Sequence, residues 1–259
     1  MKNIVLLILF AFSCCAYSQE PIETDRPDQT ECASVVAPGL IQLETGVLYT
    51  NDRFDDIGGH YREQSYNYAT SLLRIGVFKQ AELRLEVGEY EKSLVEGPGL
   101  HAGVEGFSPF VIGTKIAVCE ESGILPKTAF IGHLQLPFGD EQFIRKNEVL
   151  PSFCFTMAHT LSKRFSMGYN LGMDWTSGSA VPAYFYTWTV GAAATRHFEV
   201  FVETFGNFAH GELPESYFDI GGGYRVSDNF KLDCSGGISL NENSTDLFIS
   251  VGFAVRIPR

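Results

Sequence analysis

Charged and hydrogen-bonding side chains recur at alternate positions through much of the chain, on the face opposite to large apolar side chains. A polar surface of this kind could select solutes by charge and hydrogen bonding, or its acids and bases could pair and fill an interior. We keep both interpretations open. The candidate lumen-lining or gating residues are Asp25, Arg26, Glu44, Arg74, Glu82, Arg84, Glu86, Lys115, His133, Glu199, Glu203, Asp219, Arg225, Lys231, Asp233 and Arg256.

Hydrolytic chemistry has one weak candidate pair. His133 and Ser152 fall in neighbouring segments and could face the same side. A serine nucleophile needs a base and an acid within hydrogen-bond reach, and the sequence contains no GxSxG or comparable signature. His159 shares its face with Phe155 and Met157, which is typical of an interfacial residue. We therefore predict that the protein is not an enzyme.

The cysteines give no sign of metal or redox chemistry. Beyond the first residues they are Cys32, Cys119, Cys154 and Cys234, which are widely spaced and form no CxxC pair. We expect small buried or lipid-facing thiols, with no metal and no cofactor.

The elements that must position the polar face are β-strands. Phe165, Met167, Tyr169, Leu171 and other large residues alternate strictly with small or polar ones as far as Trp175, a period that a helix cannot present on one face. About twelve such segments occur, each near the length that a tilted strand needs to cross a bilayer. They lie near residues 39–50, 64–77, 81–91, 107–119, 127–138, 150–161, 165–176, 182–195, 198–208, 217–226, 229–239 and 246–257.

The connections between these segments alternate in length. Long polar connections are predicted at residues 51–63, 92–106, 139–149 and 207–216, and tight ones at 79–80, 162–164, 196–197 and 227–228, with 120–126 intermediate. This is the pattern of an antiparallel transmembrane β-barrel of about 12 strands, an up-and-down meander with long extracellular loops and short periplasmic turns. Both chain ends then lie on the periplasmic side.

Alternation shows which residues share a face, and it does not show where that face points. A secreted soluble β-protein, such as a sandwich or lipocalin-like barrel, would turn the apolar face inward. Two features favour the membrane: Tyr, Trp and Phe gather near segment ends as interfacial girdles do, and the other face is rich in Gly, Ser, Thr and Asn.

Three regions follow from this pattern. Residues 1–18 read as a signal peptide, with Lys2, an apolar run and a small-x-small site at Ala16-Tyr17-Ser18. Residues 19–38 form an N-terminal periplasmic or plug segment, and residues 39–259 form the barrel. The formal net charge of −12 disfavours nucleic-acid partners, since phosphate recognition needs a basic surface.

Several strings also resemble one bacterial family. Residues 23–31 (ETDRPDQTE) and 39–46 (GLIQLETG) resemble its T-D-R-P-x-x-T-E … G-x-x-Q-x-E-x-G opening, and residues 73–76, 113–115, 136–139 and 229–233 match its later motifs, with Lys231 in place of the usual Gln. The family is an outer-membrane, transporter-like β-barrel family labelled by a MetA-pathway of phenol degradation.

The resemblance implies an outer-membrane transporter or channel for small, aromatic or hydrophobic molecules in a Gram-negative bacterium. Its expected partners are outer-membrane lipid, the outer-membrane assembly machinery and an unidentified small solute. The alternative is a structural or ligand-binding barrel with a closed lumen and no transport.

Overall fold

The computed structural model describes residues 20–56, 59–95, 101–140, 143, 148–211, 213–241 and 247–258. The predicted signal peptide, residues 1–18, lies outside this part of the chain. The described residues form strands and turns. Among them, no helix is long and apolar enough to cross a membrane.

The strands follow one another along the chain with mostly short turns at one end. Their bounds are β1 Leu40–Asp56, β2 Gly59–Phe78, β3 Ala81–Val95, β4 His101–Phe107, β5 Val111–Cys119, β6 Lys127–Gln135, β7 Leu150–Thr160, β8 Phe165–Asp174, β9 Ala183–Ala193, β10 Phe198–Phe208, β11 Glu215–Ser227, β12 Phe230–Ser239 and β13 Leu247–Pro258.

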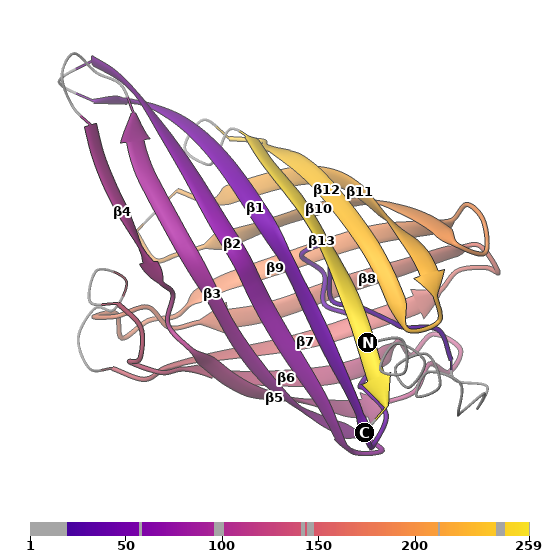
Figure 1. The fold of residues 1–259 in the computed structure, drawn as a ribbon. Coiled ribbons are helices and arrows are strands. Elements are labelled where there is room, and N and C mark those ends of the chain that lie inside the picture. Colours follow the sequence, from indigo (N-terminus) through magenta and orange to yellow (C-terminus); the bar gives the residue numbers. More distant parts are fainter. Residues whose placement is uncertain are drawn as a thin grey trace, which may run out of the picture.

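These strands form one closed antiparallel ring (Figure 1). Apart from β4 and β5, each strand pairs with its neighbours in sequence, β1 pairs with β13, and the β2–β3 pairing completes the circle. Both β4 and β5 pair with β3, one after the other along its length, so together they occupy a single place in the wall. The ring therefore has twelve wall positions, which confirms the predicted twelve-stranded meander.

Two predicted connections are wrong in part. The stretch 51–63 was expected to be a long loop, but β1 and β2 stay paired through it as far as Asp56 and Gly59. The stretch 92–106 is likewise shortened, because β3 continues to Val95 and pairs with β4. The alternation of apolar residues marks only the part of a strand whose outer face is apolar. Strand pairing can continue beyond that part through polar residues, where the sequence pattern gives no signal.

The distribution of side chains is the reverse of that in a soluble sandwich. Among the described residues, large buried side chains include Arg74, Arg84 and Lys115, whereas Leu171 and Ile220 are exposed on the outside, as are many other apolar residues. The wall strands therefore turn their apolar face outward and their polar face into the ring. This arrangement contradicts the soluble alternative and is the one that a lipid surround requires.

Candidate functional site

The candidate site is the interior of the ring, which an N-terminal segment (residues 20–38) enters. The indigo trace of this segment passes within the circle of strands in Figure 1. Its side chains and backbone bond to residues of β1, β3, β5, β10, β12 and β13. Ile22, Ala33 and Val36 are buried there, so the segment is packed as well as hydrogen-bonded.

A cluster of ion pairs joins three strands of the wall. Arg74 of β2 donates to Glu44 of β1 at 3.0 Å and to Glu82 of β3 at 2.8 Å, and Arg84 contacts Glu82 at 3.2 Å. All four side chains are no more than 1% exposed. Strand alternation places them on the inner face, and their mutual pairing offsets part of the cost of burying charge.

Asp25 of the N-terminal segment is inserted into this cluster. Its carboxylate lies 2.8 Å from Lys115 Nζ, 2.7 Å from Arg84 Nη1 and 3.1 Å from Arg74 Nη1. Burial alone would raise the pKa of Asp25, but the three neighbouring cations outweigh it and hold the pKa well below its usual range. Asp25 is therefore an anion that ties the segment to three strands at once.

Glu31 is a second acid of the segment that meets the same cations. It contacts Arg84 at 2.8 Å and Lys115 at 3.2 Å. Burial, together with the nearby Asp25 charge, raises the pKa of Glu31 to about 7 against the opposing effect of Arg84 and Lys115. Glu31 thus changes its charge near neutral pH while Asp25 remains ionised.

Wall carboxylates also bind the backbone of the segment. Glu44 accepts hydrogen bonds from the Asp25 and Arg26 amides at 2.9 and 3.1 Å, and Glu82 accepts one from the Val36 amide at 2.6 Å. A segment without secondary structure has amides that need partners when buried, and these carboxylates supply them.

Arg26 occupies a seat formed by two glycines. Gly46 of β1 and Gly252 of β13 are direct partners in the strand register, and a Cβ at either position would collide with the Arg26 guanidinium. From this seat Arg26 donates to Asp233 at 3.0 Å and to Ser250 at 2.9 Å. The missing side chains leave space on the wall that the guanidinium fills.

A separate acidic pair lies on β10 and β11. Glu203 and Asp219 are direct partners in the strand register, and both are buried. Glu203 accepts the Gln29 amide at 2.7 Å and the Thr30 hydroxyl, whereas neither carboxylate oxygen of Asp219 has a hydrogen-bond partner among the described residues. Burial and the neighbouring Glu203 raise the pKa of Asp28, the next acid of the segment, well above its usual range.

Lys231 of β12 also contacts the N-terminal segment. It donates to the Thr24 hydroxyl at 2.8 Å and pairs with Glu199 at 2.5 Å. Glu199 is half exposed, so this pair lies at the edge of the interior rather than in its centre.

The other sequence-predicted residues lie around this centre. Glu86 is 4.0 Å from Arg84 and 3.5 Å from His133. Arg225 bonds the Arg196 carbonyl at 2.6 Å, and Arg256 bonds Asn229 and backbone carbonyls near the β11–β12 turn. The two arginines are therefore at the end of the barrel that carries the β9–β10 and β11–β12 turns, away from the central cluster.

Sequence reasoning missed Glu31, Thr30 and Gln42 as contributors to the interior. Gln42 is 1% exposed, and it donates to Glu44 and to the Glu23 carbonyl. Its position two residues before Glu44 on an alternating strand was the available signal. Glu31 and Thr30 had none, because an irregular segment does not reveal which side chains point toward the wall.

The hydrolase candidates are occupied by other contacts. Arg84 Nε donates to His133 Nε2 at 3.0 Å, and the Ser152 hydroxyl bonds Asp174. His133 and Ser152 are register partners, but the lone pair that a general base would use is already taken by Arg84.

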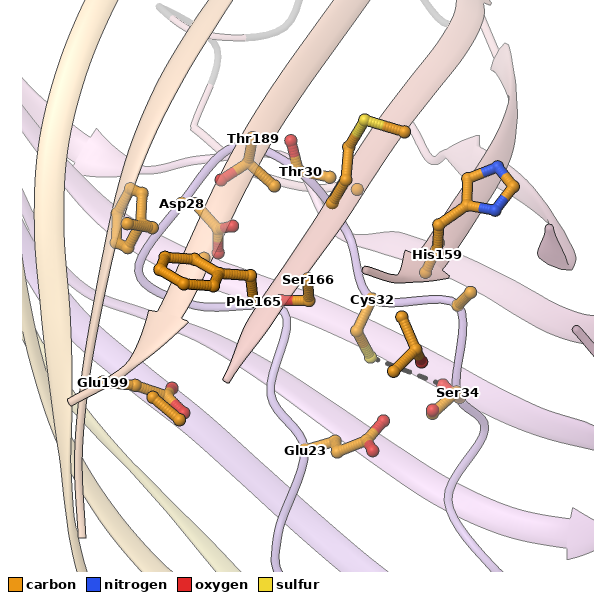
Figure 2. A pocket seen from close by; sticks show the side chains of 18 of the residues that line it. Glu23, Asp28, Thr30, Cys32, Ser34, His159, Phe165, Ser166, Thr189 and Glu199 are labelled. Atoms are coloured by element: carbon orange, nitrogen blue, oxygen red, sulfur yellow. Dashed lines mark hydrogen bonds between the residues drawn. The ribbon is translucent and has the colours of Figure 1, made fainter. Parts of the chain in front are cut away.

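A cavity of about 500 Å³ opens beside the segment toward the end of the ring that carries the β7–β8 turn. Figure 2 shows Asp28, Thr30 and Cys32 of the segment and Phe165 and Thr189 of the wall among the residues that line it. The segment therefore reduces the lumen without filling it at this end.

With this geometry described, the family can be stated. The chain belongs to the family described as "Putative MetA-pathway of phenol degradation", whose model matches residues 24–257. This confirms the family resemblance found in the sequence. No curated protein matches the sequence.

Solved structures share the fold at low sequence identity. An outer membrane channel from Pseudomonas putida F1 superposes with a TM-score of 0.71 at 11% identity, covering 91% of this chain and 100% of that one. The translocator domain of the autotransporter NalP from Neisseria meningitidis gives 0.57 at 8% identity, covering 86% and 90%. These similar structures are a channel and a translocator rather than enzymes.

Proposed function

We propose that the protein is an outer-membrane channel for small molecules, with its N-terminal segment as the constriction of the pore. The observation that carries this proposal is a polar, ion-paired interior inside a ring whose outer surface is apolar. Such a ring needs lipid around it and leaves a hydrophilic path within it. The family and the fold of the similar structures support the same function.

The orientation follows from the connections. Most of the short turns, Glu20 and the last residues of β13 share one end of the ring, which is the periplasmic end in barrels of this kind. The N-terminal segment therefore enters from the periplasm after signal-peptide export. Outer-membrane lipid and the barrel assembly machinery are the partners that this location requires.

The solute class is small molecules, among them aromatic or hydrophobic ones. The family description, which concerns phenol degradation, supports this class. With the segment in place, the open spaces in the lumen are a few hundred cubic ångströms each, which suits small solutes rather than polymers.

A barrel with a closed lumen and no transport is the second candidate function. The observation that favours it is the network of ion pairs that joins two acids of the segment to three cations of the wall. Asp25 and Glu31 pair with Arg74, Arg84 and Lys115, and these contacts block this side of the interior. In that case the segment is a permanent part of the core.

Single-channel recording in planar lipid bilayers separates these functions. The intact protein and a variant lacking residues 20–38 should be compared under the same salt. A channel gives discrete conductance steps in the intact protein and larger steps in the deletion variant. If the intact protein is silent and only the deletion variant conducts, the closed barrel is correct.

A further inference from the structure

A second cavity, of about 440 Å³, lies on the other side of Gln29 from the cavity of Figure 2. The register pair Phe205 and Tyr217 lines it. This pair lies on the same face as Glu203 and Asp219, two residues nearer to the β10–β11 connection. We call this cavity the aromatic chamber. Its lining comprises Gln29, Leu48, Thr50, Asp174, Phe185, Tyr186, Thr187, Phe205, Gly206, Asn207, Glu215, Tyr217 and Phe248.

Aromatic rings on the inner face give the chamber its name. Phe205 stacks on Tyr217 with centroids 4.9 Å apart and planes 14° apart, and Phe248 meets Phe205 at 5.9 Å in an edge-on arrangement. A Cβ at Gly237 would collide with the Phe248 ring, and one at Gly172 with the Phe185 ring. Because they lie against glycine, these two rings can turn a face toward the lumen.

The charge of the chamber is of one sign. Asp174 and Glu215 are acidic, and no basic residue occurs among the described residues that line it. Glu215 accepts hydrogen bonds from Asn207 at 2.9 Å and Tyr217 at 3.2 Å, which fix its carboxylate beside the rings. The buried lumenal cations Arg74, Arg84 and Lys115 are committed to the cluster around the N-terminal segment, and Lys231 is committed to Thr24 and Glu199.

A further acid, Asp219, lies next to the chamber residues on β11. Asp219 is fully buried, and both its carboxylate oxygens are without a hydrogen-bond partner in the part of the chain that the structure describes. On β11 it follows the chamber residue Tyr217 by two residues, and its register partner Glu203 precedes Phe205 by two residues on β10. A buried carboxylate in this state is costly unless a positive charge or a donor lies nearby.

Resting on the proposed channel function, we propose that the aromatic chamber binds a small organic ammonium ion as it enters the lumen. The electron-rich faces of Phe205, Tyr217 and Phe248 attract a cation and accept its alkyl substituents, as aromatic cages do. The lining acids Asp174 and Glu215 supply the balancing charge. A neutral aromatic solute would contact the rings but would not neutralise the charge of the acids.

Calorimetric titration of the full barrel in detergent micelles tests this inference with a matched pair of probes. Choline and its uncharged isostere 3,3-dimethyl-1-butanol have nearly the same shape and differ in charge. We expect choline to bind about tenfold more tightly than the alcohol. Equal binding of the two probes, or no binding of choline, overturns the inference.

Variants locate the binding. Phe205→Leu removes the central ring and should weaken choline binding about fivefold or more, with little effect on the alcohol. Phe218→Leu changes an exposed ring on the outer face of β11 and is the control. Glu215→Gln removes one acid of the chamber and keeps the size of the side chain. Folding is verified by the gel shift between heated and unheated samples, and unchanged choline binding in folded Phe205→Leu overturns the site.

Conductance measured on the same preparation keeps the two proposals distinguishable. A barrel that conducts but binds both probes equally contradicts only the ammonium site. A barrel that binds choline selectively but never conducts contradicts only the channel.

Discussion

Lys115 Nζ of β5 lies 2.8 Å from Asp25 Oδ1 of the N-terminal segment, and both side chains are almost completely buried. Ninety positions separate the two residues in sequence. The contact therefore joins the segment to the wall at the centre of the ring, and Arg74 and Arg84 share the same carboxylate.

Asp25→Asn should release the N-terminal segment. The substitution leaves three buried cations with one fewer partner, and breaking a buried ion pair in this way costs about 3–5 kcal/mol. We expect larger or more frequent conductance steps in planar bilayers. The matched control is Glu23→Gln, an exposed acid of the same segment. Identical recordings for Asp25→Asn and the wild type would falsify the role of Asp25 in constriction.

Gly46→Ala should expel Arg26 from its seat. The new methyl group would occupy the position of the guanidinium, and the ion pair with Asp233 would be lost with it. We expect the segment to become sensitive to protease in liposomes, measured as the rate of cleavage near Arg26. Gly132→Ala is the control, because its nearest neighbour is at an ordinary contact distance of 3.6 Å. Equal cleavage rates for the two variants would show that the seat does not hold the segment.

Channel opening should increase with pH through the titration of Glu31. The pKa of Glu31 rises from an ordinary value of 4.5 to about 7 when the segment is docked. Docking is thus strongest below about pH 4.5, where Glu31 is protonated in both states, and it weakens as the pH rises to about 7. Asp25 stays ionised across this window and adds no slope, whereas Asp28, whose pKa is also raised in the docked segment, adds slope of the same sign.

The measurement is open probability at pH 5 and pH 8 in the same bilayer. We expect an increase of about threefold or more in the wild type, since one unit of pKa shift corresponds to about tenfold and Glu31 is partly exposed. Glu31→Gln should reduce the pH dependence, and the part that remains belongs to Asp28. A wild-type profile that is already flat, or one that falls with pH, would contradict the assignment to Glu31.

Ile220→Arg should destabilise the barrel in lipid. Ile220 lies near the middle of β11 and is 58% exposed on the outer face, so in a protein surrounded by water this change would have little effect. At the centre of a bilayer it costs about 2–4 kcal/mol. The measurement is the urea midpoint of folding into phospholipid vesicles. Ile124→Arg, in the exposed turn between β5 and β6, is the control, and equal midpoints for both variants would argue against a lipid surround.

The wall could be predicted from the sequence because strand alternation is a local property. The period of two placed Glu44, Glu82, Arg84 and Lys115 on one face before any partner was known, and the structure has them buried inside the ring. The partners themselves could not be predicted. Which acid meets which base depends on the register between strands and on the shape of the closed ring.

The N-terminal segment shows the limit most clearly. Its composition indicated a plug or a leader, and Asp25 and Arg26 were among the predicted interior residues, but no periodicity distinguished Glu31, which meets the same cations, from Glu23, which is exposed. The seat for Arg26 was equally hidden, because it consists of the absence of side chains at Gly46 and Gly252. A glycine in a strand has several uses, and only the structure shows which residue occupies the space.

The seat of Arg26 also fixes an order of events in assembly. Gly46 belongs to the first strand and Gly252 to the last, and Asp233 is 207 positions from Arg26. The seat does not exist until the first and last strands have met. The N-terminal segment precedes every described strand in the sequence and is among the last parts to reach its place, so its docking shows that the ring has closed.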